Sequence, residues 1–264
     1  MVSQITAFHQ TTDGRVETLW VRPEGRDPDT VLVLLHEGLG CIDLWRDFPQ
    51  RLASRSGFGV FAYSRVGYGR SDPCTLPRPL TYMHHEAENI LPQVLESLEA
   101  ESVILVGHSD GASIAAIHAG GTPDPRLSGL ILMGPHFFAE PVSIRSIAEA
   151  KTAYETGTLR EGLAKYHGDN VDCAFRGWND AWLDPEFRHW NLTGFLPNIR
   201  VPVLFIQGKE DQYGTLRQLA ALKRHLPSSP DSRVIGQSRH SPHLDQPGET
   251  LETMDHFLKH ARAG

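Results

Sequence analysis

Short, almost wholly apolar runs recur along the chain and alternate with segments long enough to form helices. Strands covered by helices on both faces have this pattern, whereas half-exposed strands alternate apolar and polar residues. The sequence therefore predicts an α/β protein with a mostly parallel sheet. The predicted buried strands are Val31–Leu35, Val60–Tyr63, Val103–Val106, Leu130–Met133 and Val201–Ile206, and a further strand is expected near Arg233–Ile235. Helices are predicted between the strands, at about 42–56, 80–99, 110–120, 214–226 and 247–260. Arg15–Val21 does alternate, and we expect an antiparallel edge strand there.

One long stretch, residues 135–198, interrupts this rhythm. It contains no convincing strand but is dense in aromatic residues. We expect a helical cap insertion packed over a core formed by residues 1–134 and 199–264. Most of the aromatic rings would hold the insertion together, and the others would line a pocket beneath it.

Composition and charge narrow the class of protein. The 264 residues include 25 Lys and Arg against 32 Asp and Glu, a net charge of −7, which disfavours a nucleic-acid binder. No apolar stretch approaches the roughly 18 residues of a membrane span, and residues 1–15 show no secretory pattern. Cys41, Cys74 and Cys173 are far apart, which disfavours a disulfide scaffold or a zinc site. We expect a cytoplasmic protein whose partner is a small molecule rather than a nucleic acid or a membrane; its oligomeric state is left open.

A glycine-flanked serine follows one of the predicted strands. The segment Gly107-His108-Ser109-Asp110-Gly111 lies between that strand and a helix of small residues. A serine on such a tight turn needs neighbours without side-chain bulk, which the two glycines provide. The positive end of the helix dipole and the Asp110 amide would stabilise an oxyanion there. The pattern predicts Ser109 as a nucleophile. A glycine-rich connection without chemistry is the alternative, and a phosphate cradle is disfavoured because the P-loop lysine is missing.

The chain resembles the α/β-hydrolase superfamily over nearly its whole length. GHSDG (107–111) is similar to the family's nucleophile elbow, HEGLG (36–40) to its HGxxG oxyanion loop, and SRVGYGRS (64–71) to its DxRGxGxS segment. The resemblance implies the α/β-hydrolase fold, with a mostly parallel central sheet flanked by helices. It also implies a second oxyanion amide from Gly38, with Leu39 as the alternative because Glu37 replaces a usual glycine. Ser64 replaces an aspartate, and we expect its role to be structural.

A nucleophilic serine needs a base, which a third group orients. In the superfamily the acid and then the histidine follow the serine along the chain. Asp211 follows the predicted strand at 201–206, at the end where α/β sheets place their chemistry, and Glu210 is the second choice. The other place where the superfamily can carry the acid, after the preceding strand at 130–133, has no carboxylate in this sequence. SRHSPHLDQP (238–247) resembles the family's GHxxHxxxP stretch, which implies His240 rather than His243 as the base.

These residues together predict a serine hydrolase that cleaves a small or medium carboxylic ester through an acyl-enzyme. Ser109 would attack the carbonyl carbon, His240 would move the proton, and Asp211 would orient the imidazole, without cofactor or metal. A thioester, a lactone or a carbon–carbon bond could be cleaved by the same triad. The chain could also be a cofactor-free perhydrolase or haloperoxidase, or a non-catalytic ligand-binding relative.

Overall fold

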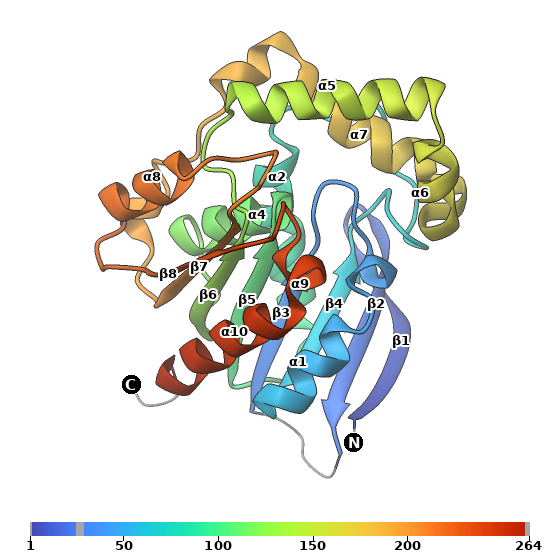
Figure 1. Ribbon diagram of the computed structural model, residues 1–264. Helices are drawn as coiled ribbons and strands as arrows, with labels where there is room; N and C mark the ends of the chain where they lie inside the picture. The colour runs from blue at the N-terminus through green and yellow to red at the C-terminus, as the bar shows by residue number, and fades with distance from the viewer. Residues whose placement is uncertain (1, 25–28, 262–264) are drawn as a thin grey trace.

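An eight-stranded sheet with the order β1-β2-β4-β3-β5-β6-β7-β8 forms the centre of the chain (Figure 1). The computed structural model describes residues 2–24 and 29–261; residues 1, 25–28 and 262–264, which the predicted core unit includes, lie outside the described residues. From β4 to β8 neighbouring strands are parallel, whereas β2 pairs antiparallel with both β1 and β4. The strands are β1 (Val2–Thr11), β2 (Gly14–Pro23), β3 (Thr30–Leu35), β4 (Gly59–Ser64), β5 (Ser102–His108), β6 (Leu127–Met133), β7 (Val203–Gly208) and β8 (Asp231–Ile235).

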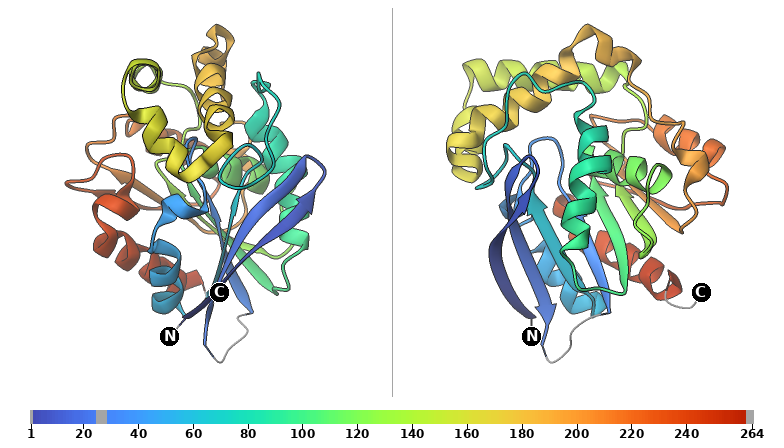
Figure 2. Two further views of the ribbon diagram at one scale, coloured as in Figure 1. Left: turned by 90° about the vertical axis from the view of Figure 1, so that its right-hand side faces the viewer. Right: turned by 180° about the vertical axis from the view of Figure 1, so that it is seen from behind.

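Helices cover both faces of the sheet. The helices α1 (Phe48–Ser56) and α10 (Pro247–Ala261) lie on one face, and α4 (Asp110–Gly120) lies on the other with α2 (Tyr82–His85) and α3 (Leu91–Glu96) (Figure 2). Side chains of β3 alternate between the two resulting cores, because successive residues of a strand point to opposite faces. Both faces are therefore apolar, which explains the unbroken hydrophobic runs of the central strands.

The segment between β6 and β7 is helical. It contains α5 (Pro141–Thr156), α6 (Leu159–His167) and α7 (Val171–Leu183), followed by single-turn 3-10 helices at 185–189 and 196–198. Figure 1 shows α5 and α7 lying across the carboxyl ends of the parallel strands. Aromatic rings from this segment stack on one another, for example Tyr154 on Phe175 with ring centres 3.6 Å apart. Among the described residues, no helix combines the length and apolar character that a membrane crossing requires.

The predicted mostly parallel sheet is confirmed, but its antiparallel end is different from the prediction. The strand predicted at 15–21 is β2, and it is not an edge strand because β1 lies outside it. Strand β1 was missed because almost all its residues are exposed or half-exposed, so it lacks an apolar face. It is held by its hairpin pairing with β2, which joins Thr11 to Gly14 through two residues.

Candidate active site

Ser109 lies at the turn between β5 and α4, in a backbone conformation that few residues adopt. Its φ is 53° and its ψ is −117°, so a non-glycine residue occupies the positive-φ region. A Cβ added at Gly111 would lie 2.0 Å from the Leu35 carbonyl oxygen, and one at Gly107 would lie 2.4 Å from the Ala112 Cα. The two glycines are therefore required for the helix to approach the sheet so closely, and the strained turn presents the serine at the sheet edge.

The loop after β3 lies next to this turn. Gly38 and Leu39 are the central residues of a turn closed by a hydrogen bond from the Gly40 amide to the Glu37 carbonyl, 3.1 Å long. Within the described part of the chain, neither the Gly38 nor the Leu39 amide donates a hydrogen bond. The Asp110 amide is the first of α4, where a helix provides no partner. Three amides near Ser109, those of Gly38, Leu39 and Asp110, are thus available to bind an oxyanion. That the Gly38 amide rather than the Leu39 amide is the second donor stays a prediction.

A buried arginine, Arg65, holds the loop after β3 in place by hydrogen bonds. The Arg65 guanidinium donates to the carbonyl oxygens of His36 and Glu37 over 2.6 and 2.9 Å, and the Arg65 amide donates to His36 Nε2 over 3.1 Å. Burial lowers the pKa of His36 well below its usual value, so the ring stays neutral and can accept that bond. Arg65 comes from the SRVGYGRS segment, which gives that motif a structural function.

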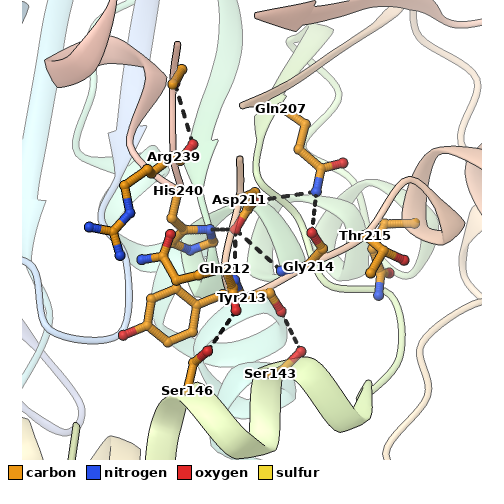
Figure 3. Close-up of polar contacts among 12 residues, drawn as sticks. Ser143, Ser146, Gln207, Asp211, Gln212, Tyr213, Gly214, Thr215, Arg239 and His240 are labelled. Carbon is orange, nitrogen blue, oxygen red and sulfur yellow. Dashed lines mark hydrogen bonds and ion pairs between the residues drawn. The ribbon is translucent and has the colours of Figure 1, made fainter. Parts of the chain in front are cut away.

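His240 and Asp211 form a buried pair. His240 Nδ1 donates to Asp211 Oδ1 over 2.9 Å, and the same oxygen accepts the amides of Tyr213 and Gly214 (Figure 3). Burial by itself would raise the pKa of Asp211, but the charge and hydrogen bond of His240 outweigh it and lower the pKa to about 2. Asp211 is therefore ionised at neutral pH, and its bond to Nδ1 leaves Nε2 of His240 as the free nitrogen.

Residues of the β6–β7 segment hold the loop that carries Asp211. From α5, Ser143 donates to the Tyr213 carbonyl and Ser146 donates to the Gln212 carbonyl over 2.7 Å (Figure 3). From β7, Gln207 donates to Asp211 Oδ2 over 3.3 Å. The carboxylate is thus oriented by a strand and a helix that are far apart in the sequence.

Ser109 and His240 line one small cavity of about 160 Å³ beneath the β6–β7 segment. The hydrogen bonds of the described residues include none between the Ser109 hydroxyl and the His240 ring; catalytic hydrogen bonds of free enzymes are often long and shorten when substrate binds. A larger hollow of about 310 Å³ beside Glu140 contains neither residue. The cavity is lined by Glu37, Gly38, Leu39, Ser109, Asp110, His136, Ile147, Trp178, Trp182, Gln212, Tyr213, His240 and Ser241.

A buried histidine and a carboxylate lie close together behind the elbow. His108 is fully buried; its Nε2 donates to the His240 carbonyl oxygen over 2.8 Å, and its Nδ1 lies 3.4 Å from Glu37 Oε2. Burial would lower the pKa of His108, but the adjacent Glu37 carboxylate raises it above the usual value. The pair joins the Gly38 loop to the backbone of His240, so the unusual Glu37 is a structural connection between two parts of the site.

The structure places Glu210 and His243, the alternative acid and base, away from the reacting groups. Glu210 is exposed, and within the described residues only Asp211 contacts the His240 ring as a carboxylate. The His243 ring packs on Trp45 and Phe48, and it does not line the cavity. Cys41 is buried, and burial raises the pKa of its thiol to about 12, which leaves it unreactive. In residues 2–24 and 29–261, no three His, Cys, Asp or Glu side chains are grouped as metal ligands.

Several cavity residues were not identified from the sequence. Neither His136 nor Gln212 was predicted as a site residue. Trp178 and Trp182 belong to the aromatic-rich stretch, and aromatic density alone does not tell a pocket ring from a core ring. His167 accepts the Gly69 amide and donates to the Leu39 carbonyl, each over 3.0 Å, and thereby ties α6 to the Gly38 loop.

Sequence comparison places most of the chain in one family. Residues 32–253 match the sequence profile described as "Alpha/beta hydrolase family". The (lyso)-N-acylphosphatidylethanolamine lipase of Bos taurus is 33% identical over 136 residues, which are 50% of this chain and 39% of the relative. The 1-acylglycerol-3-phosphate O-acyltransferase ABHD5 of Sus scrofa is 34% identical over 142 residues, 47% of this chain and 38% of the relative. The match thus spans less than two fifths of these curated relatives.

Solved structures share the fold at low sequence identity. The 2-hydroxy-6-oxo-6-phenylhexa-2,4-dienoate hydrolase of Rhodococcus sp. strain RHA1 superposes with a TM-score of 0.76 at 18% identity, covering 100% of both chains. Naproxen esterase of Bacillus subtilis superposes with a TM-score of 0.74 at 20% identity, covering 97% of this chain and 92% of that one. At these identities the likeness establishes the fold alone.

Proposed function

The chain belongs to the alpha/beta hydrolase family, and from that premise we propose that it is a serine hydrolase that cleaves a small carboxylic ester. One observation carries the proposal. A serine on a strained positive-φ turn and a histidine bonded to a buried carboxylate line the same cavity. A ligand-binding relative without chemistry has no need of either feature.

The proposed reaction has two steps. Ser109 Oγ attacks the ester carbonyl carbon while His240 Nε2 takes its proton, and the amides of Asp110 and Gly38 stabilise the oxyanion. The bond to the alcohol oxygen then breaks, and His240 returns the proton to that oxygen. Water attacks the acyl-enzyme with His240 as base, which releases the acid and restores Ser109. Asp211 holds the imidazole by Nδ1 and stabilises its cation in both steps.

The choice of an oxygen ester is supported by the names of similar proteins. One curated relative is called a lipase and one an acyltransferase, and two of the similar solved structures are called esterases. The cavity of about 160 Å³ is below the roughly 300 Å³ of common ligand pockets, which favours a small substrate over a long acyl chain.

The first test is covalent labelling followed by turnover. A fluorophosphonate should attach at Ser109, and the wild-type protein should hydrolyse p-nitrophenyl acetate or butyrate faster than the corresponding thioesters and lactones. Ser109→Ala should lose both labelling and turnover, with a loss of about 10⁶-fold expected for the nucleophile of a triad.

Ser128→Ala is the matched control. Ser128 lies near the amino end of β6, where its hydroxyl bonds to Ser102, so the same substitution is made away from the cavity. It should retain labelling and turnover. Labelling that persists in Ser109→Ala, or esters that are cleaved more slowly than thioesters and lactones, would contradict the proposal.

A further inference from the structure

An unused histidine lies in the wall of the cavity. His136 follows β6 by three residues, and its ring is buried between two other cavity residues, with ring centres 5.1 Å from Trp182 and 5.7 Å from His240. Gly214 closes the other side, where an added Cβ would lie 3.5 Å from His136 Cε1. The ring is thus fixed beside the groups proposed to react.

The nitrogens of this ring have no partner among the residues that the structure describes. Both hydrogen bonds of His136 involve its main chain, which contacts the Ser113 hydroxyl, and no other described residue bonds to the imidazole. Nδ1 is fully buried as well. Buried polar atoms are nearly always paired, and an unpaired one is costly, so an unpaired ring in a cavity wall indicates a group that a ligand satisfies.

The ring is neutral. Burial, together with the charge that His240 can carry, lowers the pKa of His136 to about 3. A neutral imidazole donates from one nitrogen and accepts at the other, so it complements a hydroxyl or another neutral polar group. An anionic substituent is disfavoured, because the Glu37 carboxylate lines the same cavity and Asp211 lies behind His240.

A second unpaired group lies in the same wall. Gln212 Oε1 is buried and has no hydrogen-bond partner in residues 2–24 and 29–261, whereas the Gln212 backbone carbonyl accepts a hydrogen bond from Ser146. Asp110 also lines the cavity; its buried Oδ1 is unpaired within the described residues, while its Oδ2 accepts the Tyr82 hydroxyl. The cavity therefore combines the apolar surfaces of Trp178, Trp182 and Ile147 with the unpaired His136 and Gln212 groups. A purely aliphatic ester would leave both polar groups unpaired on binding.

We infer that the substrate is an ester that carries a neutral hydrogen-bonding substituent, such as a hydroxyl group, and that His136 binds this substituent. The inference rests on the proposed ester hydrolysis and names its substrate class. His136 is here a specificity-determining residue: it does not take part in proton transfer, and it contributes most to esters that carry the substituent.

Two matched pairs of small esters test the inference through acid release. In the first pair the hydroxyl is on the acid part, propyl 3-hydroxybutyrate against propyl 3-methylbutyrate. In the second it is on the alcohol part, 2-hydroxyethyl butyrate against propyl butyrate. Each pair exchanges a hydroxyl for a methyl group of similar size. The wild-type protein should favour the hydroxy ester in one of the two pairs by about tenfold or more in kcat/KM.

His136→Phe removes both nitrogens and keeps an aromatic ring against Trp182. In that variant the selectivity ratio should fall to about one, with the hydroxy ester losing most, whatever the change in absolute rate. His84→Phe is the control, because His84 also has an unpaired Nδ1 but packs on Phe195 outside the cavity. It should keep the wild-type ratio. Melting curves of all variants confirm that each is folded.

The outcomes separate the two claims. If neither pair shows a preference in the wild-type protein, or if the preference survives in His136→Phe, the inference is wrong while the serine hydrolase stands. If none of the four esters is cleaved and Ser109 does not react with a fluorophosphonate, the proposed function itself fails.

Discussion

Replacing Gly38 with alanine tests whether the β6–β7 segment holds the loop proposed to bind the oxyanion. A Cβ at this position would lie 2.2 Å from Cδ1 and 2.3 Å from Nε1 of Trp178. Ordinary contacts begin at 3.4 Å, so the indole or the loop would have to move by about 1.2 Å. Trp178 is buried beside Phe175, with ring centres 6.1 Å apart, which limits its retreat.

The size of the effect follows from this overlap. Overpacking of a tight site costs about 1–3 kcal/mol of stability, which corresponds to a fall of several degrees in melting temperature. A displaced loop amide would also weaken oxyanion binding, and loss of one such donor lowers kcat by about 10²–10³-fold. We therefore expect Gly38→Ala to lower kcat on the preferred ester by that factor, measured by steady-state kinetics beside a melting curve.

Two further variants make the test specific. Gly162→Ala introduces the same methyl group within α6, where no atom of the described residues outside the helix lies within 4 Å of it. This variant should keep full activity, with stability raised by up to about 1 kcal/mol. Trp178→Leu removes the obstructing ring, so adding Gly38→Ala to it should cost less than in the wild-type background. Equal losses in the two backgrounds, or an unimpaired Gly38→Ala, would refute the contact as the cause.

Three further predictions use other parts of the site. Asp211→Asn should lower kcat by about 10⁴-fold, measured by ester hydrolysis with the folded variant, because the asparagine side chain no longer holds the required tautomer of His240. A loss below tenfold would exclude Asp211 as the orienting acid. Gly111→Ala should prevent folding, because its Cβ would lie 2.0 Å from a β3 carbonyl oxygen that cannot move; a folded variant by circular dichroism would contradict this. Lowering the pH from about 7.5 to about 5 should reduce the urea midpoint. His36 and His167 accept backbone amides while buried and neutral, with pKa values below 6.5. The folded state then binds fewer protons than the unfolded chain, so stability present above pH 6.5 is lost as the pH falls towards the folded pKa values. An unchanged midpoint would show that these histidines do not determine acid stability.

Much of the candidate site is readable from the sequence because it consists of local motifs. The glycines on either side of Ser109 mark a turn that only those residues permit, and the position of Asp211 follows from the end of an apolar run. The contact of Asp211 with His240 was predicted only through a family resemblance, since 29 residues separate them. His136 was not identified, because a histidine after a strand has no local signal that separates a cavity wall from a core.

The order of apolar runs and helix-length segments determines the fold class, because a wholly apolar strand must be covered by helices on both faces. Strand β1 and the residues that cover the cavity could not be predicted in this way. Strand β1 has no apolar face and exists through its pairing with β2. Trp178 reaches the cavity from α7, Gln212 is held there by Ser146 of α5, and the His136 main chain is held by Ser113 of α4. Packing is a property of the whole assembled surface, so no segment of sequence contains it, and only the tertiary structure decided which side chains form the cavity.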